Sequence, residues 1–178
     1  ELQKYKNEVQ RERKSLETDI EKLKKQRDQL GLSINAYEGR LSALEHGLFS
    51  PPRYLTDDDT SEMLKAKLDA VRSKQKELIK EKRATTHPAG YTVDGDKKKG
   101  TEFVNDTIKL ILRAFNNECD VIIAGVKHTN HDRSIDKIAK SFKQLNSLTD
   151  MQSVFMTDEY LRLKLQELKI GWATLNWT

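Results

Sequence analysis

Four side chains in the second half of the sequence belong to types that bind metals or act as nucleophiles. Cys119, His128, His131 and Asp132 lie within one short stretch. Zinc sites usually contain two short ligand pairs at set spacing, whereas this stretch has only the pair His128 and His131. The spacing therefore favours solvated loop histidines and a Cys119 that packs as a small apolar group. We predict neither a metal nor another cofactor.

The best candidate for an anion contact is the run Lys97, Lys98 and Lys99, which follows Tyr91 in the sequence. The surrounding segment GDKKKG lacks the spacing of a P-loop and its final Lys-Ser/Thr. Because a helix is predicted to begin just after the run, the ammonium groups, backbone N–H groups and helix dipole could converge on a phosphate. Such a contact would be sensitive to salt and indifferent to nucleic-acid sequence. The alternative is an ordinary solvated turn.

No arrangement typical of an enzyme occurs in the chain. The sequence has no dinucleotide-binding fingerprint and no nucleophile elbow. Its many carboxylates fall within the charge patterns of helix surfaces, and a Cys–His nucleophile would require an activating geometry that spacing alone does not supply. We therefore predict no catalytic residue in this chain.

The composition is typical of long, solvated helices. Charged residues make up 34% and hydrophobic residues 36% of the 178 residues, and the net charge is +4. Ordinary domains are about a quarter charged, so the apolar residues here must form narrow stripes. The sequence pI near 9.0 permits contact with nucleic acid without requiring it. The two signs of charge are interleaved, as on solvated helix faces.

The cysteine count and hydropathy suggest where the chain resides. A single cysteine excludes an internal disulfide framework and fits a reducing compartment. No apolar run reaches membrane-spanning length. We expect a cytoplasmic chain that makes no membrane contact of its own. Because the sequence begins within a helical pattern and without Met, we expect a longer protein, which could carry an inner-membrane anchor upstream.

A heptad repeat runs through the first part of the chain. Position d holds an apolar residue in every heptad: Leu2, Val9, Leu16, Leu23, Leu30, Tyr37 and Leu44. Position a holds Lys6, Arg13, Ile20, Arg27, Ile34, Leu41 and Leu48. Leucine at d with basic residues at a favours a parallel dimer over larger bundles. The predicted pairing residues are Leu16, Ile20, Leu23, Leu30, Ile34, Tyr37, Leu41 and Leu44. The alternative is a helix that packs on its own domain.

The remaining sequence predicts a helical domain. The arm ends near Gly47, and helical apolar stripes predict a helix over 61–83, a central core helix from Phe103 past Cys119, and helices over 135–148 and after Thr157. Residues 85–90 contain helix breakers. The turn Asp94-Gly95 predicts either a small hairpin or an ordered loop. The expected fold is mainly α, with a coiled-coil arm (1–48) and a helical recognition domain (49–178) that has at most one short β-hairpin.

The stretch Tyr91–Asp120, YTVDGDKKKGTEFVNDTIKLILRAFNNECD, resembles a bacterial and phage domain family of unassigned function. The likeness is most specific over Val104–Asp120 and extends to Leu64–Lys82 and Thr157–Leu168. Members carry this domain between an N-terminal coiled coil and a C-terminal GIY-YIG-type nuclease domain. They look like parts of anti-phage or mobile-element proteins. The resemblance implies a non-catalytic module that recognises or positions a target for a nuclease whose motifs are absent from this chain.

A polar set lies beside the apolar face of the central helix: Asn105, Asp106, Arg113, Asn116, Asn117 and Glu118. These residues could form a binding surface, or they could fix interhelix contacts and caps. The predicted surface for nucleic acid or a partner consists of Tyr91, the lysine run and the members of this polar set other than Glu118.

Two functional hypotheses follow. The first is a recognition and oligomerisation module that self-associates through residues 1–48 and senses a phage protein, a host protein or nucleic acid. The alternative is a nucleic-acid-binding module that grips phosphates through the basic loop.

Overall fold

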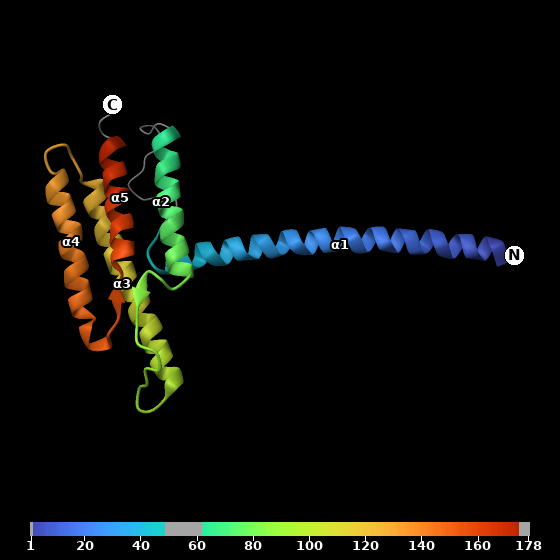
Figure 1. The fold of residues 1–178 in the computed structure, drawn as a ribbon, viewed down its shortest axis with the longest axis horizontal. Coiled ribbons are helices and arrows are strands. Elements are labelled where there is room, and N and C mark those ends of the chain that lie inside the picture. Colours follow the sequence, from blue (N-terminus) through green and yellow to red (C-terminus); the bar gives the residue numbers. More distant parts are fainter. Residues whose placement is uncertain (1, 49–61, 175–178) are drawn as a thin grey trace. The chain divides into compact units, whose positions relative to one another are not determined.

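Five α-helices and two short strands make up the part of the chain that the structure describes, residues 2–48 and 62–174 of a computed structural model. Their bounds are α1 (Leu2–Glu45), α2 (Glu62–Lys80), β1 (Thr85–Thr86), α3 (Lys97–Ala124), α4 (His131–Leu148), a 3-10 turn (Asp150–Gln152), β2 (Phe155–Met156) and α5 (Asp158–Thr174) (Figure 1). The predicted fold class is confirmed: a long N-terminal helix followed by a helical domain with one short strand pair.

The chain divides into two compact units, Glu1–Gly39 and Arg40–Thr178. The second unit includes the last turns of α1. Gly47, with φ of 75°, ends α1 in a left-handed conformation, and the N–H of Leu48 donates to the Ala43 carbonyl at 2.9 Å. Ala43 and Leu48 are both buried in the core of this unit. Helix α1 thus ends close to Gly47, and Leu48 belongs to the domain core and not to an exposed heptad seam.

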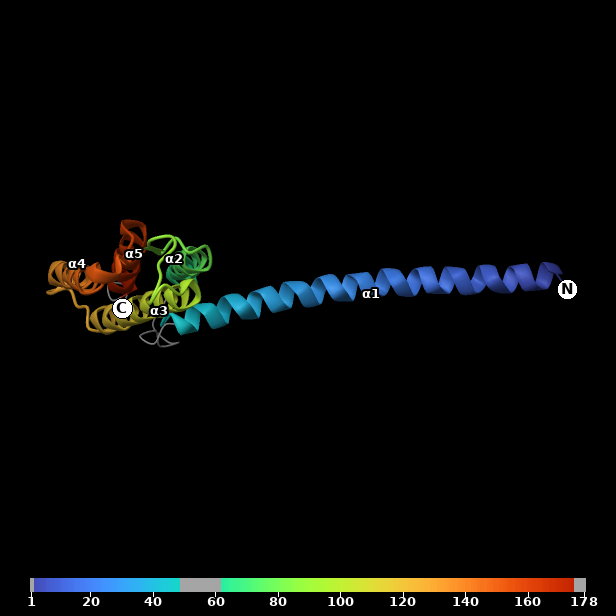
Figure 2. The same ribbon diagram turned by 90° about the horizontal axis from the view of Figure 1, so that it is seen from below.

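Helices α2 to α5 pack around one core, as the view from below shows (Figure 2). Helix α2 packs on α5, α3 packs on α4, and α5 also contacts α3 and α4. Helix α3 carries the widest apolar face, as predicted for a central helix. Its buried residues include Ile111, Leu112, Phe115, Cys119 and Ile123. The prediction that Cys119 packs as a small apolar group is confirmed.

The two strands join distant segments of the chain in an antiparallel pair. Thr85 lies opposite Met156, and Thr86 lies opposite Phe155. The Asn146 side chain fixes β2, because its amide donates to the Met156 carbonyl at 3.2 Å and accepts from the Met156 N–H at 2.8 Å. The sequence predicted a small hairpin or an ordered loop at Asp94-Gly95 instead. There the structure has a tight turn around Asp94 and Gly95.

The helix boundaries agree with the predicted ones to within a few residues, with one consequential difference. Helix α3 begins at Lys97 and not near Phe103, so the lysine run forms a helical turn. At α5, the Tyr160 N–H lies 3.4 Å from the Thr157 hydroxyl oxygen, so Thr157 caps the helix that was predicted to follow it.

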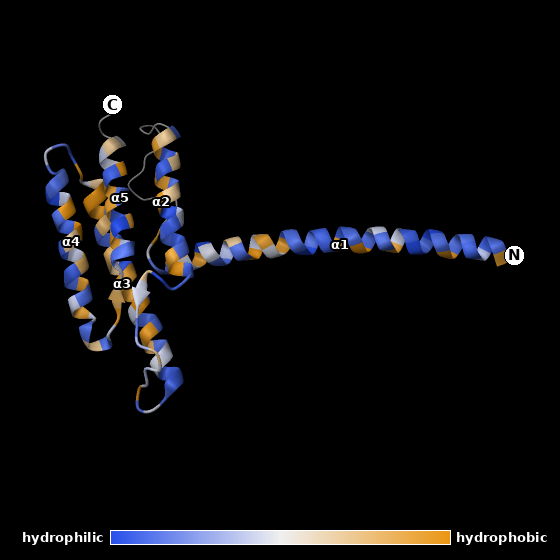
Figure 3. Ribbon diagram, viewed as in Figure 1, coloured by the Kyte–Doolittle hydropathy of each residue, from blue (hydrophilic) through white to orange (hydrophobic). Residues whose placement is uncertain are grey.

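Polar and apolar residues are mixed along every helix of the described chain (Figure 3). This mixture agrees with the narrow stripes that the composition predicted. Of the helices within 2–48 and 62–174, none is both long enough and apolar enough to cross a membrane.

Candidate functional site

The first candidate surface is the heptad seam of α1. Its d-position side chains are largely solvent-exposed in the single chain: 63% for Leu23, 62% for Leu30 and 67% for Tyr37. All other predicted pairing residues are exposed as well, namely Leu16, Ile20, Ile34, Leu41 and Leu44. Along α1, apolar residues recur within a hydrophilic helix (Figure 3). Large apolar side chains exposed at heptad spacing are typical of a coiled-coil interface.

The basic a positions distinguish the two halves of this seam. Arg13 pairs with Glu17 at 3.1 Å, and Arg27 pairs with Asp28 at 2.8 Å, both on the solvent-exposed helix surface. From Ile34 onward, every a and d residue of α1 is apolar or aromatic. The C-terminal half of the seam therefore offers the larger apolar surface for pairing.

The lysine run forms the first turn of α3, and Lys97, Lys98 and Lys99 are all exposed. Asp96 caps this helix: its carboxylate accepts the N–H groups of Lys98 at 2.8 Å and Lys99 at 3.2 Å. These backbone donors are thus already occupied by an anionic side chain. The expected convergence of N–H groups and lysines on one phosphate does not form here, and only the lysine side chains remain for an anion.

Tyr91 lies against this end of α3 because residue 100 is glycine. A Cβ at Gly100 would lie 1.9 Å from the Tyr91 carbonyl oxygen, so no other residue permits this close approach. The Tyr91 ring stacks on Phe103, with ring centroids 5.7 Å apart and planes inclined by 15°. Phe103 remains 40% exposed. The structure therefore brings Tyr91 to the same end of α3 as the predicted lysines.

The polar set on α3 does not form one surface. Asn105, Asp106, Arg113 and Asn117 are exposed. Asn116 is fully buried: its amide donates to the His46 carbonyl at 2.7 Å and accepts from the Tyr160 hydroxyl at 2.8 Å. Its contacts therefore fit the interhelix alternative.

Glu118 also makes an interhelix contact, since its carboxylate accepts a hydrogen bond from the Ser141 hydroxyl on α4. This contact joins α3 to α4. Like the contacts of Asn116, this contact fits the alternative in which the polar set fixes interhelix contacts.

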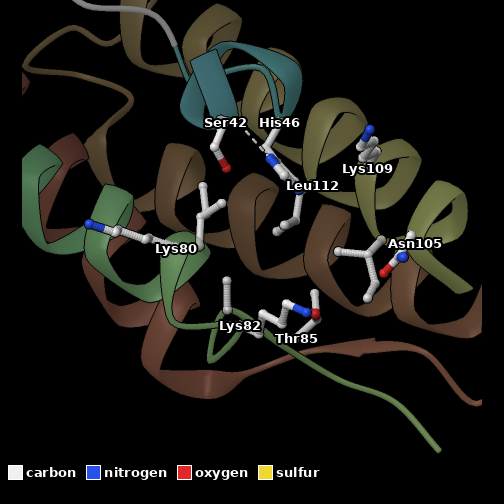
Figure 4. Close-up of a pocket in the computed structure, with 11 residues that line it drawn as sticks. Ser42, His46, Lys80, Lys82, Thr85, Asn105, Lys109 and Leu112 are labelled. Carbon is white, nitrogen blue, oxygen red and sulfur yellow. Dashed lines mark hydrogen bonds between the residues drawn. The ribbon is translucent and has the colours of Figure 1, made fainter. Parts of the chain in front are cut away.

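A cavity of about 230 Å³ lies between the end of α1, the turn after α2, strand β1 and helix α3 (Figure 4). Its apolar lining includes the buried Ile79, Ala84 and Leu112. Asn105 is the one predicted site residue among its lining. Sequence reasoning missed the rest, because the lining comes from segments that lie far apart in the chain.

A buried charged cluster, formed by Arg72 and Gln75 of α2 with Lys164 and Glu167 of α5, was also missed. All four are at most 2% exposed. The Glu167 carboxylate accepts from Arg72, from Gln75 at 2.8 Å and from Lys164 at 3.1 Å. One signal was present: residues 64, 68, 72, 75 and 79 have helical core spacing. The polar residues at 72 and 75 interrupt that stripe.

The interior shifts the proton affinities of nearby groups. Burial is the largest single influence on the pKa of Lys164 and lowers it, but Glu167 together with Tyr160, Cys119 and Asp120 outweighs burial and raises that pKa, so the ammonium stays charged. Burial raises the pKa of the Cys119 thiol, which therefore stays protonated. None of these residues lines the cavity of Figure 4.

A family model for the SNIPE-associated domain matches residues 61–175. The chain belongs to the SNIPE-associated domain family. The match spans α2 to α5 and thus includes the strand pair and the buried charged cluster. Neither the curated proteins nor the solved structures contain a match to the chain.

In the SNIPE-associated domain, His131 lies beside one acidic side chain: its Nδ1 is 3.2 Å from the Asp132 carboxylate. Within residues 2–48 and 62–174, no three His, Cys, Asp or Glu side chains are grouped so that they could hold a metal ion. The His131 ring also lies beside the Trp172 ring, with ring centroids 4.6 Å apart, and His128 is exposed.

Tyr160 of the SNIPE-associated domain is expected to ionise at about pH 12, because burial raises its pKa from the ordinary value of 10.0. The folded state then holds the proton more tightly than the unfolded state. The resulting stabilisation is complete below about pH 10 and is lost as the pH rises towards 12. The difference in tyrosinate absorbance between wild type and Tyr160→Phe measures this group alone. A midpoint near pH 10 in that difference would contradict the burial of Tyr160.

Proposed function

We propose that this chain is a self-associating recognition module of a larger protein. In this proposal α1 pairs two copies, and the SNIPE-associated domain contacts a phage or host target for a nuclease domain that lies outside the chain. The chain itself contributes no catalytic residue. Its membership in the SNIPE-associated domain family supports the recognition part. The exposed seam of α1 is the single observation that supports self-association most strongly.

Pairing is favoured because the seam has much apolar area to bury. Burying a leucine or isoleucine side chain contributes about 1.5–3 kcal/mol. Ile34, Tyr37, Leu41 and Leu44 supply four consecutive core layers without a charged residue. Like charges would meet at Lys6, Arg13 and Arg27 in a parallel pair, so the strongest pairing is expected in the half near the domain.

Replacing Ile34 and Leu41 together by Asp is expected to convert a dimer into a monomer, because each chain would then bury two carboxylates in the interface. Sedimentation velocity at tens of micromolar chain measures the mass. Leu32→Asp is the matched control, because Leu32 is 72% exposed but lies off the seam. A monomeric wild type, or a double variant that remains dimeric, would refute self-association through α1.

Nucleic-acid binding is the second candidate function, and the stacked pair Tyr91 and Phe103 favours it. Exposed aromatic rings beside lysines are the usual platform for single strands, because bases stack on the rings and phosphates contact the ammonium groups. Here the exposed Phe103 ring lies one to two helical turns from the lysine run. The site needs no backbone N–H group, so the Asp96 cap does not prevent it.

Changing Lys97, Lys98 and Lys99 to Glu is expected to weaken binding of a labelled single-stranded oligonucleotide and to flatten its salt dependence. Fluorescence anisotropy over a salt titration measures both. The control changes three other exposed lysines, Lys137, Lys140 and Lys143, to Glu. Equal affinity in the two variants, or no binding to wild type at low salt, would exclude this function.

A further inference from the structure

The cavity of Figure 4 has a lining of one charge sign. Lys80, Lys82 and Lys109 contribute to it, His46 lies at its edge, and no carboxylate is among the lining residues. From this lining we propose that the cavity binds a nucleoside phosphate, either as a free nucleotide or as one unit of a strand. The site is separate from the lysine run at the start of α3, and the proposal does not depend on pairing through α1.

Two of the lysines are available to a phosphate without losing a partner. Neither Lys80 nor Lys82 forms an ion pair within the described chain, whereas Lys109 lies 3.5 Å from Glu45 in an exposed pair. Figure 4 shows the Lys80 side chain extending away from Asn105 and Lys109. Lys82 is therefore the first expected phosphate contact, and Lys109 can join it only by leaving Glu45, since lysine binds phosphate as a mobile point charge.

The backbone at Lys82 is the second observation. Its φ of 57° is in the left-handed region, directly after α2, where glycine is the usual residue. The turn is fixed by the N–H of Lys82 to the Ile79 carbonyl at 3.1 Å and the N–H of Arg83 to the Leu78 carbonyl at 2.8 Å. A lysine held in this conformation is less favourable than glycine. Its presence fits a side chain that is needed for a ligand.

The remaining lining selects the organic part of the ligand. Ile79, Ala84 and Leu112 form a buried apolar surface on which a flat base can lie. Asn105 offers an amide, the group that pairs most readily with the hydrogen-bonding edge of adenine. The volume of about 230 Å³ is below that of pockets for drug-sized ligands. It therefore holds the base and part of the sugar, while the phosphate lies at the mouth of the cavity, where Lys82 is exposed.

The test uses the full chain and a fluorescent N-methylanthraniloyl derivative of AMP, displaced by unlabelled competitors. AMP is expected to displace the probe, while adenosine and inorganic phosphate are each expected to be about tenfold weaker, because each keeps only half of the contacts. If a single-stranded adenine oligonucleotide displaces the probe at lower concentration than AMP does, the ligand is one unit of a strand. If it needs a higher concentration than AMP, the ligand is the free nucleotide. Inorganic phosphate or an acidic peptide that matches AMP would overturn the proposal.

Lys82→Gly separates a ligand role from a structural one. Affinity for the probe is expected to fall about tenfold with the loss of one charge-assisted contact. The melting temperature is expected to stay the same or rise, because glycine suits a φ of 57°. Lys109→Gln is a second pocket variant. The surface control is Lys137→Gln, because a glycine at position 137 would itself destabilise helix α4. Unchanged affinity for the probe in both pocket variants, or an equal loss of affinity in Lys137→Gln, would overturn the assignment. Neither result bears on self-association through α1, which sedimentation velocity tests separately.

Discussion

Glu167→Gln is expected to destabilise the helical domain by about 3–5 kcal/mol, the range for removing one partner of a buried ion pair. The carboxylate is fully buried and accepts from Arg72, Gln75 and Lys164. An amide in its place removes the negative charge that Arg72 and Lys164 share in the interior. Urea unfolding followed by circular dichroism, at one fixed chain concentration, measures the change.

A surface pair on the same helix provides the matched control. Glu159 contacts Arg83 at 3.1 Å, but both side chains are about half exposed, so Glu159→Gln should change stability by less than about 1 kcal/mol. Replacing Arg72 and Lys164 by Met together with Glu167→Leu removes all three charges at once. That variant is expected to recover most of the lost stability. If Glu167→Gln costs no more than Glu159→Gln, the cluster is not as buried as described.

Gly100→Ala is expected to cost about 1–3 kcal/mol through overpacking and to release the loop from α3. The new Cβ would lie 1.9 Å from the Tyr91 carbonyl oxygen and 2.8 Å from the Thr92 Cα. Both are backbone atoms, so no rotamer change relieves the clash. Hydrogen exchange at residues 91–96 reports the loop, and urea unfolding reports the stability.

Gly125→Ala is the control for this substitution. A Cβ at Gly125 meets its nearest neighbour, the Val121 carbonyl oxygen, at 3.5 Å, which is ordinary contact. Its φ of −93° suits any residue. Equal loss of stability in the two variants would show that the loop does not lie on Gly100 as closely as the structure has it.

Helix positions were predictable because each helix carries its own periodic signal. The stripe of α3 and the cap at Thr157 could be recognised from neighbouring residues alone. The strand pair could not, since two-residue strands have no measurable alternation. Its register depends on Asn146, which lies between the two strands in sequence and fixes only β2.

The candidate sites were less predictable, for a different reason. Arg72 and Glu167 are charged, and charged residues are almost always placed on the surface unless a partner is known. Their partners lie on α2 and α5, far apart in sequence. The cavity beside Lys82 likewise exists only after four segments have packed together. Of the predicted site residues, Tyr91 and the lysine run were brought to one end of α3, whereas Asn116 entered the core.

The shared carboxylate of Glu167 also restricts how this sequence can change over time. Loss of Glu167 alone removes the negative charge that two buried cations share, whereas loss of Arg72 or Lys164 alone leaves one ion pair in place. A change at Glu167 by itself therefore passes through a poorly folding intermediate. Across SNIPE-associated domains, loss of the carboxylate at position 167 is expected only together with loss of both cations, whereas exposed neighbours such as Arg162 vary independently.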